Sequence, residues 1–175
     1  IGRLEDAKGF PALLNAFDKL DEIVWINKLH CVGEDHEIEK NNKIISSNNN
    51  RINLHGLLNR KEINKIYERS HFIILPSKSE GFPKVLIEAS SFGCIPIVPP
   101  IPSILFHINN EKKNGIILNS ITSSGIKQTI QDLQKLRKEF STLSTNAMEN
   151  AKHFSYEQYN DRLLNDILSF SLDVN

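Results

Sequence analysis

Short apolar runs alternate with segments of helical periodicity along most of this chain. The runs are bounded by glycine, proline or polar residues, which is typical of buried strands. Strands that alternate with helices indicate βαβ units, a parallel sheet and right-handed crossovers. We therefore expect one α/β domain over residues 1–175, a Rossmann-like doubly wound parallel sheet of about six strands flanked by helices. The runs taken as strands are Trp25–Val32, Ile52–His55, Phe72–Leu75, Ile95–Val98 and Gly115–Leu118.

Apolar residues recur at three- and four-residue spacing between those runs, as on the inner face of a helix. Asn59 followed by Glu62 predicts a capping box at one helix start. Ser155 followed by Gln158 predicts another, which opens a C-terminal helix over 155–171. The other expected helices are Phe10–Leu20, Glu34–Ile45, Pro83–Phe92 and a longer one, capped near Thr122 or Ser123, that carries Ile126 to Phe140.

The chain starts abruptly, with only Ile1 before the turn at Gly2. We expect that most of a first strand, central in the sheet, is absent and that the chain is a piece of a longer protein. Pro96 is awkward in a central strand because proline has no N–H to donate, so we place it at the start of its strand.

A strand, a loop with Glu80 and a helix starting near Pro83 follow one another in the middle of the chain. Proline suits a first helical turn, where its missing N–H would have no partner anyway. The free N–H groups at such a start form an anion site, and phosphate is its usual ligand. The amides expected to point outward are those of Lys84, Val85 and Leu86.

Glu80 and Glu88 lie eight positions apart, on either side of this helix start. Two carboxylates beside an anion site fit a ligand with hydroxyl groups at both ends of a diphosphate, because carboxylates accept hydrogen bonds from hydroxyls. That description fits a nucleotide-sugar. The alternative, on spacing alone, is a solvated Glu80 and a Glu88 that only complements the helix start.

Two cations, Arg3 and Lys8, flank a short loop near the start of the chain. Taken by itself, this segment is better explained as a solvated basic loop. However, Arg3, Gly33, Gly56 and Glu80 each follow an expected strand. Ligands of doubly wound sheets bind at the carboxyl ends of the strands, so these four residues are predicted to line one rim.

The composition limits the possible functions. The 175 residues are 39% hydrophobic and 24% charged, and 21 Lys and Arg balance 21 Asp and Glu, which argues against a nucleic-acid surface. No apolar run approaches the roughly 20 residues that span a bilayer. Cys31 and Cys94 are isolated and are expected to be buried thiols in a reducing cytoplasm. None of the six histidines stands at ligand spacing, so we expect no metal site.

Several short motifs in fixed order give the chain a resemblance to a known family. It resembles the C-terminal, donor-binding half of retaining glycosyltransferases with the GT-B fold, group 1 (family 4), over nearly its whole length. Glu80 and Glu88 match the family's E-x7-E motif. The motifs in register are Gly2-Arg3, Lys8-Gly9, Val32-Gly33, His55-Gly56, Leu75-Pro76-Ser77, Glu80-Gly81-Phe82-Pro83, Glu88-Ala89 and Gly93-x-x-Pro96.

The resemblance implies a role for each matched residue. Arg3 and Lys8 would bind the donor diphosphate and stabilise the leaving nucleotide, while Glu80 would face the transferred sugar. Glu88 would accept from the ribose hydroxyls, and Leu57 would pack against the base. The remaining donor-binding residues implied are Gly2, Gly33, Lys84, Val85 and Leu86. Pro99–Ser103 replaces a frequent Gly-Gly turn of the family, which leaves the outer wall of the sugar pocket undefined.

The function implied is transfer of a sugar from a UDP- or GDP-sugar to a glycan or lipid-linked acceptor, as in polysaccharide biosynthesis. The cations would replace a metal, and no cofactor is expected. The acceptor-binding N-terminal domain is absent, so the isolated piece would bind donor without transferring it. The resemblance implies a cytoplasmic protein, with any contact to the inner face of the membrane made through the absent half. Two alternatives are a non-catalytic nucleotide-binding or interaction module of the same fold and a Rossmann dehydrogenase, which lacks its G-x-G-x-x-G turn here.

Overall fold

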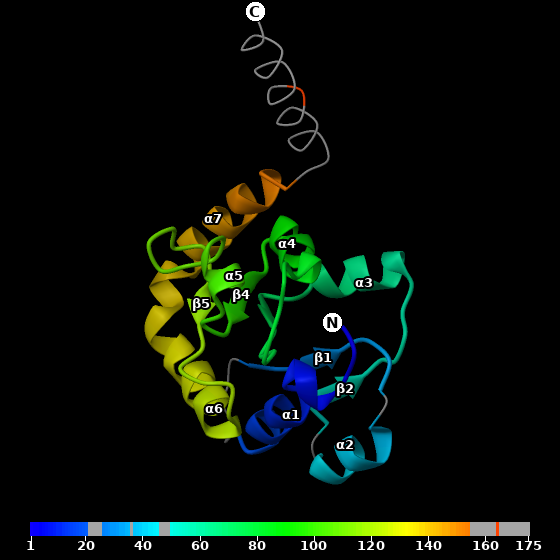
Figure 1. The fold of residues 1–175 in the computed structure, drawn as a ribbon. Helices are drawn as coiled ribbons and strands as arrows, with labels where there is room; N and C mark the ends of the chain where they lie inside the picture. The colour runs from blue at the N-terminus through cyan, green and yellow to red at the C-terminus, as the bar shows by residue number, and fades with distance from the viewer. Residues whose placement is uncertain (21–25, 36, 46–49, 155–163, 165–175) are drawn as a thin grey trace, which may run out of the picture.

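The chain folds as alternating short strands and helices, as expected (Figure 1). The computed structural model describes residues 1–20, 26–35, 37–45, 50–154 and 164. The helix expected over 155–171 lies outside this range except for Leu164. The elements are η1 (Asp6–Lys8), α1 (Phe10–Asp18), β1 (Leu29–Cys31), α2 (Ile38–Ile44), β2 (Ile52–Leu54), α3 (Arg60–Tyr67), β3 (Phe72–Ile74), α4 (Lys84–Ser91), β4 (Ile95–Val98), α5 (Pro102–Leu105), β5 (Ile116–Ile117), α6 (Ser123–Asp132), η2 (Leu133–Glu139) and α7 (Phe140–Lys152).

The strands are all parallel, but they form two sheets instead of the single sheet of about six strands. Among the described residues there are five strands, arranged as a β1–β2 pair and a three-stranded sheet in the order β3–β4–β5. The first strand is also shorter than predicted: β1 begins at Leu29, and Trp25 lies outside the described residues. A mixed α/β Rossmann-like architecture with parallel strands is therefore confirmed, with fewer strands than expected.

Pro96 occupies the second position of β4, the central strand of its sheet, and not the strand's start. The hydrogen bonds explain why it is tolerated. Ile95 donates to the His71 carbonyl and Ile97 accepts from Leu75, so these two residues bond toward β3. Pro96 and Val98, which alternate with them, point their backbone groups toward β5, and β4 pairs with β5 only from Ile97 onward. The position of Pro96 therefore requires no donor on that side.

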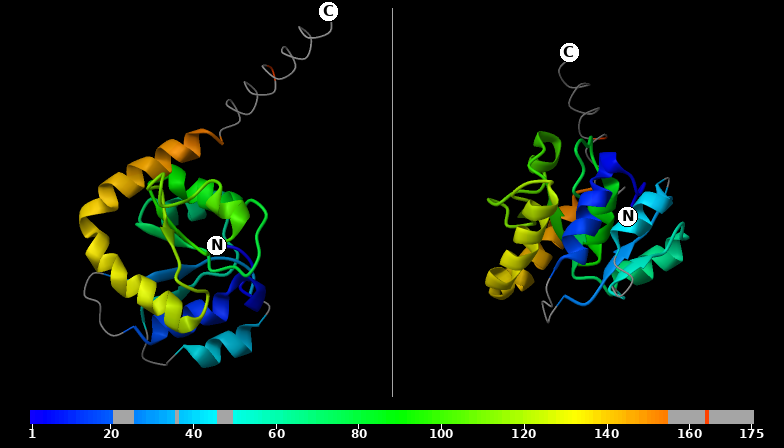
Figure 2. Two further views of the ribbon diagram at one scale, coloured as in Figure 1. Left: turned by 60° about the vertical axis from the view of Figure 1, so that its left-hand side comes forward. Right: turned by 90° about the horizontal axis from the view of Figure 1, so that it is seen from below.

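The core lies on both faces of the strands, and β4 shows the alternation clearly. Ile95 and Ile97 pack in one cluster with residues of α1, α6 and α7, whereas Val98 packs in a second cluster with residues of α4 and α5. Figure 2 shows α6, η2 and α7 forming a continuous arc around one side of the molecule. The two clusters hold the strands between layers of helices, so the strand ends keep fixed positions.

The long helix expected over Ile126–Phe140 is interrupted. Thr122 caps α6 as predicted, with its hydroxyl accepting from the Gly125 amide at 3.2 Å. A 3₁₀ segment, η2, then replaces the second half, and α7 follows as a helix that the periodicity did not separate. The change of pitch redirects the chain, so that α7 packs against α4 while α6 packs against α1. None of the helices described is both long enough and apolar enough to cross a bilayer.

A large cavity of about 1290 Å³ separates the two sheets. Its walls include β1 on one side and Phe72–Leu75 on the other. The first residues of the chain lie at one end of it, where the amides of Gly2 and Leu4 donate to the carbonyls of Val32 and Glu34, each at 2.9 Å. This backbone pairing fixes the chain start beside the carboxyl end of β1.

Candidate functional site

Three of the residues that carry the predicted chemistry, Arg3, Lys8 and Glu80, sit on two loops. The first, called here the cation loop, covers residues 2–9 and ends in η1. Gly9 closes η1 with φ of 68° and also begins α1, so one glycine turns the chain between two helices. A left-handed φ suits glycine because it has no Cβ to clash. Lys8, the last residue of η1, is thereby held at the start of α1.

The second loop, called here the acidic loop, covers residues 76–83, between β3 and α4. It packs directly on the cation loop: the Lys78 amide donates to the Ala7 carbonyl at 3.1 Å, and the Lys78 side chain pairs with Asp6. At Gly9 the two backbones approach so closely that a Cβ would lie 2.1 Å from the Pro76 oxygen. Segments about 70 positions apart are thus brought together, as the Lys8–Glu80 separation of 72 shows.

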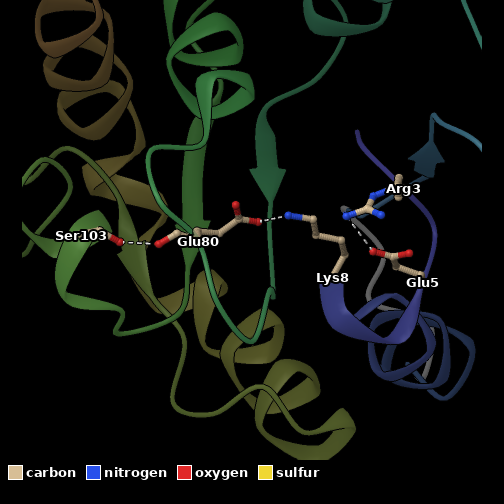
Figure 3. Close-up of polar contacts among 5 residues, drawn as sticks. All are labelled: Arg3, Glu5, Lys8, Glu80 and Ser103. Carbon is tan, nitrogen blue, oxygen red and sulfur yellow. Dashed lines mark hydrogen bonds and ion pairs between the residues drawn. The ribbon is translucent and has the colours of Figure 1, made fainter.

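Lys8 and Glu80 form an ion pair across these loops, with Nζ 2.7 Å from Oε1 (Figure 3). The Glu80 side chain is 11% exposed and that of Lys8 is 28% exposed, so the pair is largely shielded from water. Arg3 lies on the other side of Lys8 and pairs with Glu5 at 3.3 Å, but its side chain is 64% exposed. Arg3 can therefore reorient toward a ligand at low cost, whereas Lys8 and Glu80 are held in place.

Helix α4 begins one residue later than predicted. Pro83 is the residue before the first helical turn, with ψ of 97°, and Lys84 is the first residue of the helix. The Leu86 amide donates to the Pro83 carbonyl at 3.0 Å, so the expectation that this amide points outward without a partner is wrong for this conformation. The amides of Lys84 and Val85 belong to the part of a helix start that has no partner within the helix. These two remain the candidate phosphate ligands.

The other acid of the predicted pair, Glu88, lies in the second turn of α4, as expected. Its Oε2 is 2.8 Å from Nη1 of Arg60, the first residue of α3. The capping box predicted at Asn59 is present, with the Asn59 side chain accepting from the Glu62 amide and the Glu62 carboxylate accepting from the Asn59 amide. This box fixes the start of α3 and hence the position of Arg60.

Three glycines meet where the strand ends converge. The Gly33 amide donates to the Gly56 carbonyl at 2.8 Å. Gly33 also approaches Gly2 so closely that a Cβ would lie 1.8 Å from the Gly2 oxygen, and its φ is 141°. Leu57, expected at the base, follows Gly56 and is 75% exposed. The predicted rim is thus built from directly touching turns.

The cavity between the sheets unites much of this predicted site. Its lining includes both cations, Glu80 and the first two residues of α4, together with Gly2 and Pro83. Glu88 lies one turn further along α4, and Gly33 touches the lining residue Gly2. Leu57 stands on the adjacent exposed turn. The arrangement therefore offers cations, helix-start amides and a carboxylate to one ligand, as a diphosphate with a sugar requires.

Three supporting residues were missed by the sequence analysis. Ser103 donates its hydroxyl to the Glu80 carbonyl at 2.7 Å and ties the Pro99–Ser103 segment to the acidic loop (Figure 3). Glu5 forms an ion pair with Arg3, and Arg60 forms one with Glu88. The contacts of Ser103 and Arg60 depend on how separate elements pack, so no spacing in the sequence signals them. Glu5 is only two positions from Arg3, but the spacing alone does not show that the two side chains pair.

Neither cysteine shows the features of a reactive thiol. Cys31 and Cys94 are both buried and free, as expected. Burial raises the pKa of the Cys31 thiol to about 12 and that of Cys94 to about 11, so both stay protonated near neutral pH. Among the described residues, no three His, Cys, Asp or Glu side chains cluster as metal ligands would.

Comparisons with known proteins agree with this architecture. An uncharacterized glycosyltransferase of Methanocaldococcus jannaschii is 27% identical over 164 residues, which are 90% of this chain and 44% of that protein. The crystal structure of Anabaena HepE in complex with UDP superposes with a TM-score of 0.80 at 18% identity, over 96% of this chain and 48% of that one. The C-terminal domain of a group 1 glycosyl transferase (LpcC) of Francisella tularensis superposes with a TM-score of 0.73 at 18% identity, over 88% of this chain and 83% of that one.

The chain spans less than half the length of the curated relatives it matches. The sequence profile described as glycosyl transferases group 1 matches residues 1–154, which include both loops and the whole of α4. The α/β architecture with parallel strands agrees with that match. This chain belongs to the group 1 glycosyl transferase family.

Proposed function

We propose that this chain is the donor-binding half of a retaining glycosyltransferase that transfers a sugar from a nucleotide-diphospho-sugar to a glycan or lipid-linked acceptor. The observation that carries the proposal is that Arg3, Lys8, Glu80 and the start of α4 line one cavity. UDP is the first nucleotide to test, because the structurally similar HepE was crystallised with UDP and with UDP-glucose.

The cations would stabilise the nucleotide leaving group. Negative charge develops on the β-phosphate as the glycosidic bond breaks, and fixed positive charge aimed at that point stabilises the transition state. In the structure Lys8 is paired with Glu80 and Arg3 with Glu5. A bound diphosphate would give both cations a second anionic partner, with the amides of Lys84 and Val85 completing the phosphate site. The proposal requires no metal ion.

Glu80 would face the transferred sugar. Its carboxylate is held at Oε1 by Lys8, and its backbone carbonyl accepts from Ser103. A carboxylate oriented in this way can accept hydrogen bonds from sugar hydroxyls with its second oxygen. Glu88 would bind the ribose hydroxyls on the other side of the diphosphate.

The first experiment measures binding by the 175-residue chain. UDP, GDP and ADP are each added at millimolar concentration, and the preferred nucleotide should raise the melting temperature most. A ligand that binds only the native state adds about 2.7 kcal/mol to the free energy of unfolding at 100 times its Kd. Arg3→Ala and Glu88→Gln should each reduce the shift. Lys138→Ala, which removes an exposed charge outside the cavity lining, is the matched control. Binding should persist in EDTA. No shift with any of the three nucleotides would refute the proposal.

The second experiment tests catalysis in the longer polypeptide with its N-terminal domain. Sugar transfer should occur with retention at the anomeric carbon, as NMR of the product would show. Glu80→Ala should abolish transfer while the fold is retained. Nucleotide binding without any transfer, in an assay with a range of acceptors, would favour a non-catalytic module of the same fold.

We further propose that a parallel strand of the longer polypeptide lies between β1 and β3. The cavity there is bordered by the edges of two sheets that do not bond to each other. The strand would fill the part of the cavity between these edges, and the donor would bind in the part lined by the cation loop and the acidic loop. The chain start already pairs beside β1 through Gly2 and Leu4. Hydrogen exchange in the longer polypeptide should show protected amides along β1 and β3; unprotected amides along either edge would argue against the strand.

A further inference from the structure

Arg60 stands beside the acid that the proposed function assigns to the ribose. Its Nη1 lies 2.8 Å from Oε2 of Glu88, which is the distance of a charge-assisted hydrogen bond. The Glu88 side chain is 32% exposed and that of Arg60 is 59% exposed. Arg60 comes from α3 and Glu88 from α4, so the contact joins two elements that precede and follow β3.

The position of Arg60 is fixed by its place in the chain. It is the first residue of α3, and the capping box between Asn59 and Glu62 sets that helix start. It also follows Leu57, the exposed residue expected at the base, by three positions. Arg60 therefore lies at the junction between the proposed base contact and the proposed ribose contact.

Glu88 has a second neighbour on α3. Tyr67, the last residue of that helix, is 3% exposed, and burial followed by the charge of Glu88 raises the pKa of its phenol. The phenol is therefore neutral at physiological pH. The charge of Glu88 therefore acts on two residues of α3, the guanidinium at its start and the neutral phenol at its end.

The pairing of Oε2 with Arg60 lowers the entropy that Glu88 would lose on binding a ligand. Free glutamate side chains on helices sample several rotamers, and ordering one costs conformational entropy. A guanidinium that pairs with Oε2 restricts the rotamers of the carboxylate, so Oε1 and the remaining lone pairs are presented in fewer orientations. Binding to such a preorganised acceptor loses less entropy than binding to a mobile one.

We propose that Arg60 is a positioning residue that holds Glu88 ready to accept hydrogen bonds from the ribose hydroxyls of the donor nucleotide. This inference rests on the proposed function. Arg60 acts through Glu88 and is not itself a catalytic residue. The sequence motif contains the two acids but gives no sign of the cation that orients the second one.

Calorimetric titration of the 175-residue chain with UDP tests the inference. Arg60→Ala should weaken binding about threefold to fivefold, the upper range for an exposed ion pair. Arg60→Lys should recover part of the loss, because lysine keeps the charge but not the planar fork. Lys61→Ala removes an exposed charge from the next position of the same helix and should bind like the wild type.

Two further arms separate positioning from a general effect on the fold. In a Glu88→Gln background, Arg60→Ala should produce no additional loss, because the group that it orients is already changed. With 2′,3′-dideoxy-UDP, wild type and Arg60→Ala should bind equally, because the hydroxyls are gone. A purely structural role would weaken binding in both arms by the same factor as with UDP.

The outcomes are distinct for the two claims. If wild type binds UDP and Arg60→Ala binds it equally well, or if the loss persists with the dideoxy analogue or in the Glu88→Gln background, the inference is overturned and the proposed function survives. If UDP fails and GDP or ADP binds, the same arms are run with that nucleotide and its dideoxy analogue. If none of the three binds the wild type, the proposed function falls and the inference falls with it.

Discussion

Gly9 offers a sharp test of how the two loops of the site are held together. Replacing it with alanine introduces a Cβ at a position with φ of 68°, where that atom would lie 2.1 Å from the Pro76 oxygen and 2.9 Å from the Pro76 carbonyl carbon. Real contacts of this kind are longer than 3 Å. The cation loop and the acidic loop must therefore move apart by about an ångström or more, a distance that close-packed protein does not absorb freely.

The magnitude has two parts. A left-handed backbone costs a non-glycine residue about 1–2 kcal/mol, and overpacking adds roughly 1–3 kcal/mol. Gly56→Ala isolates the first part, because Gly56 has a nearly identical φ of 66° and no heavy atom of the described residues would lie within 4 Å of the new methyl group. We expect Gly56→Ala to lower the free energy of unfolding by about 1 kcal/mol and Gly9→Ala by about 2–5 kcal/mol.

Urea denaturation followed by circular dichroism measures both variants, with the midpoint and slope fitted separately. The effect of alanine on the unfolded chain is shared by the two variants and cancels in their difference. For a domain of this size each kcal/mol lowers the melting temperature by about 2–4 °C. Equal losses for the two variants, within about 0.5 kcal/mol, would refute the close contact between the loops.

Three other measurements address stability elsewhere in the chain. Asn59→Ala removes the acceptor for the Glu62 amide and should cost about 1 kcal/mol in urea denaturation, whereas Asn59→Asp should cost much less; equal losses would contradict the capping box. Burial, and then the charge of His55, lower the pKa of His30 in the folded protein. The unfolded chain therefore binds a proton at His30 at higher pH than the folded chain does. The contribution of His30 to stability is present above pH 6.5 and is lost as the pH falls below that value. Melting temperatures at pH 8 and pH 5.5 should therefore differ more for the wild type than for His30→Gln, and equal differences would contradict this assignment. Leu14→Ala empties a fully buried site and should cost about 2–5 kcal/mol, while a loss below about 1 kcal/mol would mean that the core collapses around it.

Local chemistry was readable from the sequence where it depends on neighbours along the chain. The capping box at Asn59 and the cap at Thr122 are present as predicted, because each requires residues only three positions apart. The apolar runs also indicated the parallel α/β class, since buried strands need both faces covered. The burial of both cysteines followed from their places beside those runs.

The exact ends of the helices were harder to predict from the sequence. The periodicity from Ile126 to Phe140 continues across η2, so it could not show where α6 stops and α7 begins. Similarly, the Leu86 amide was expected to be free, but it donates a hydrogen bond to the Pro83 carbonyl at the helix start. Such details depend on the last hydrogen bond of a turn, which residue type alone does not determine.

The sequence by itself determined the identity and order of the site's charged residues: two cations, two acids and a helix start between the acids. Only the tertiary structure decided which charge meets which. Lys8 reaches Glu80, Arg60 reaches Glu88, and Ser103 fixes the Glu80 backbone. The reason is that these contacts join loops and helices separated by tens of residues along the chain. The geometry of an ion pair exists only after the elements that carry its two members have packed.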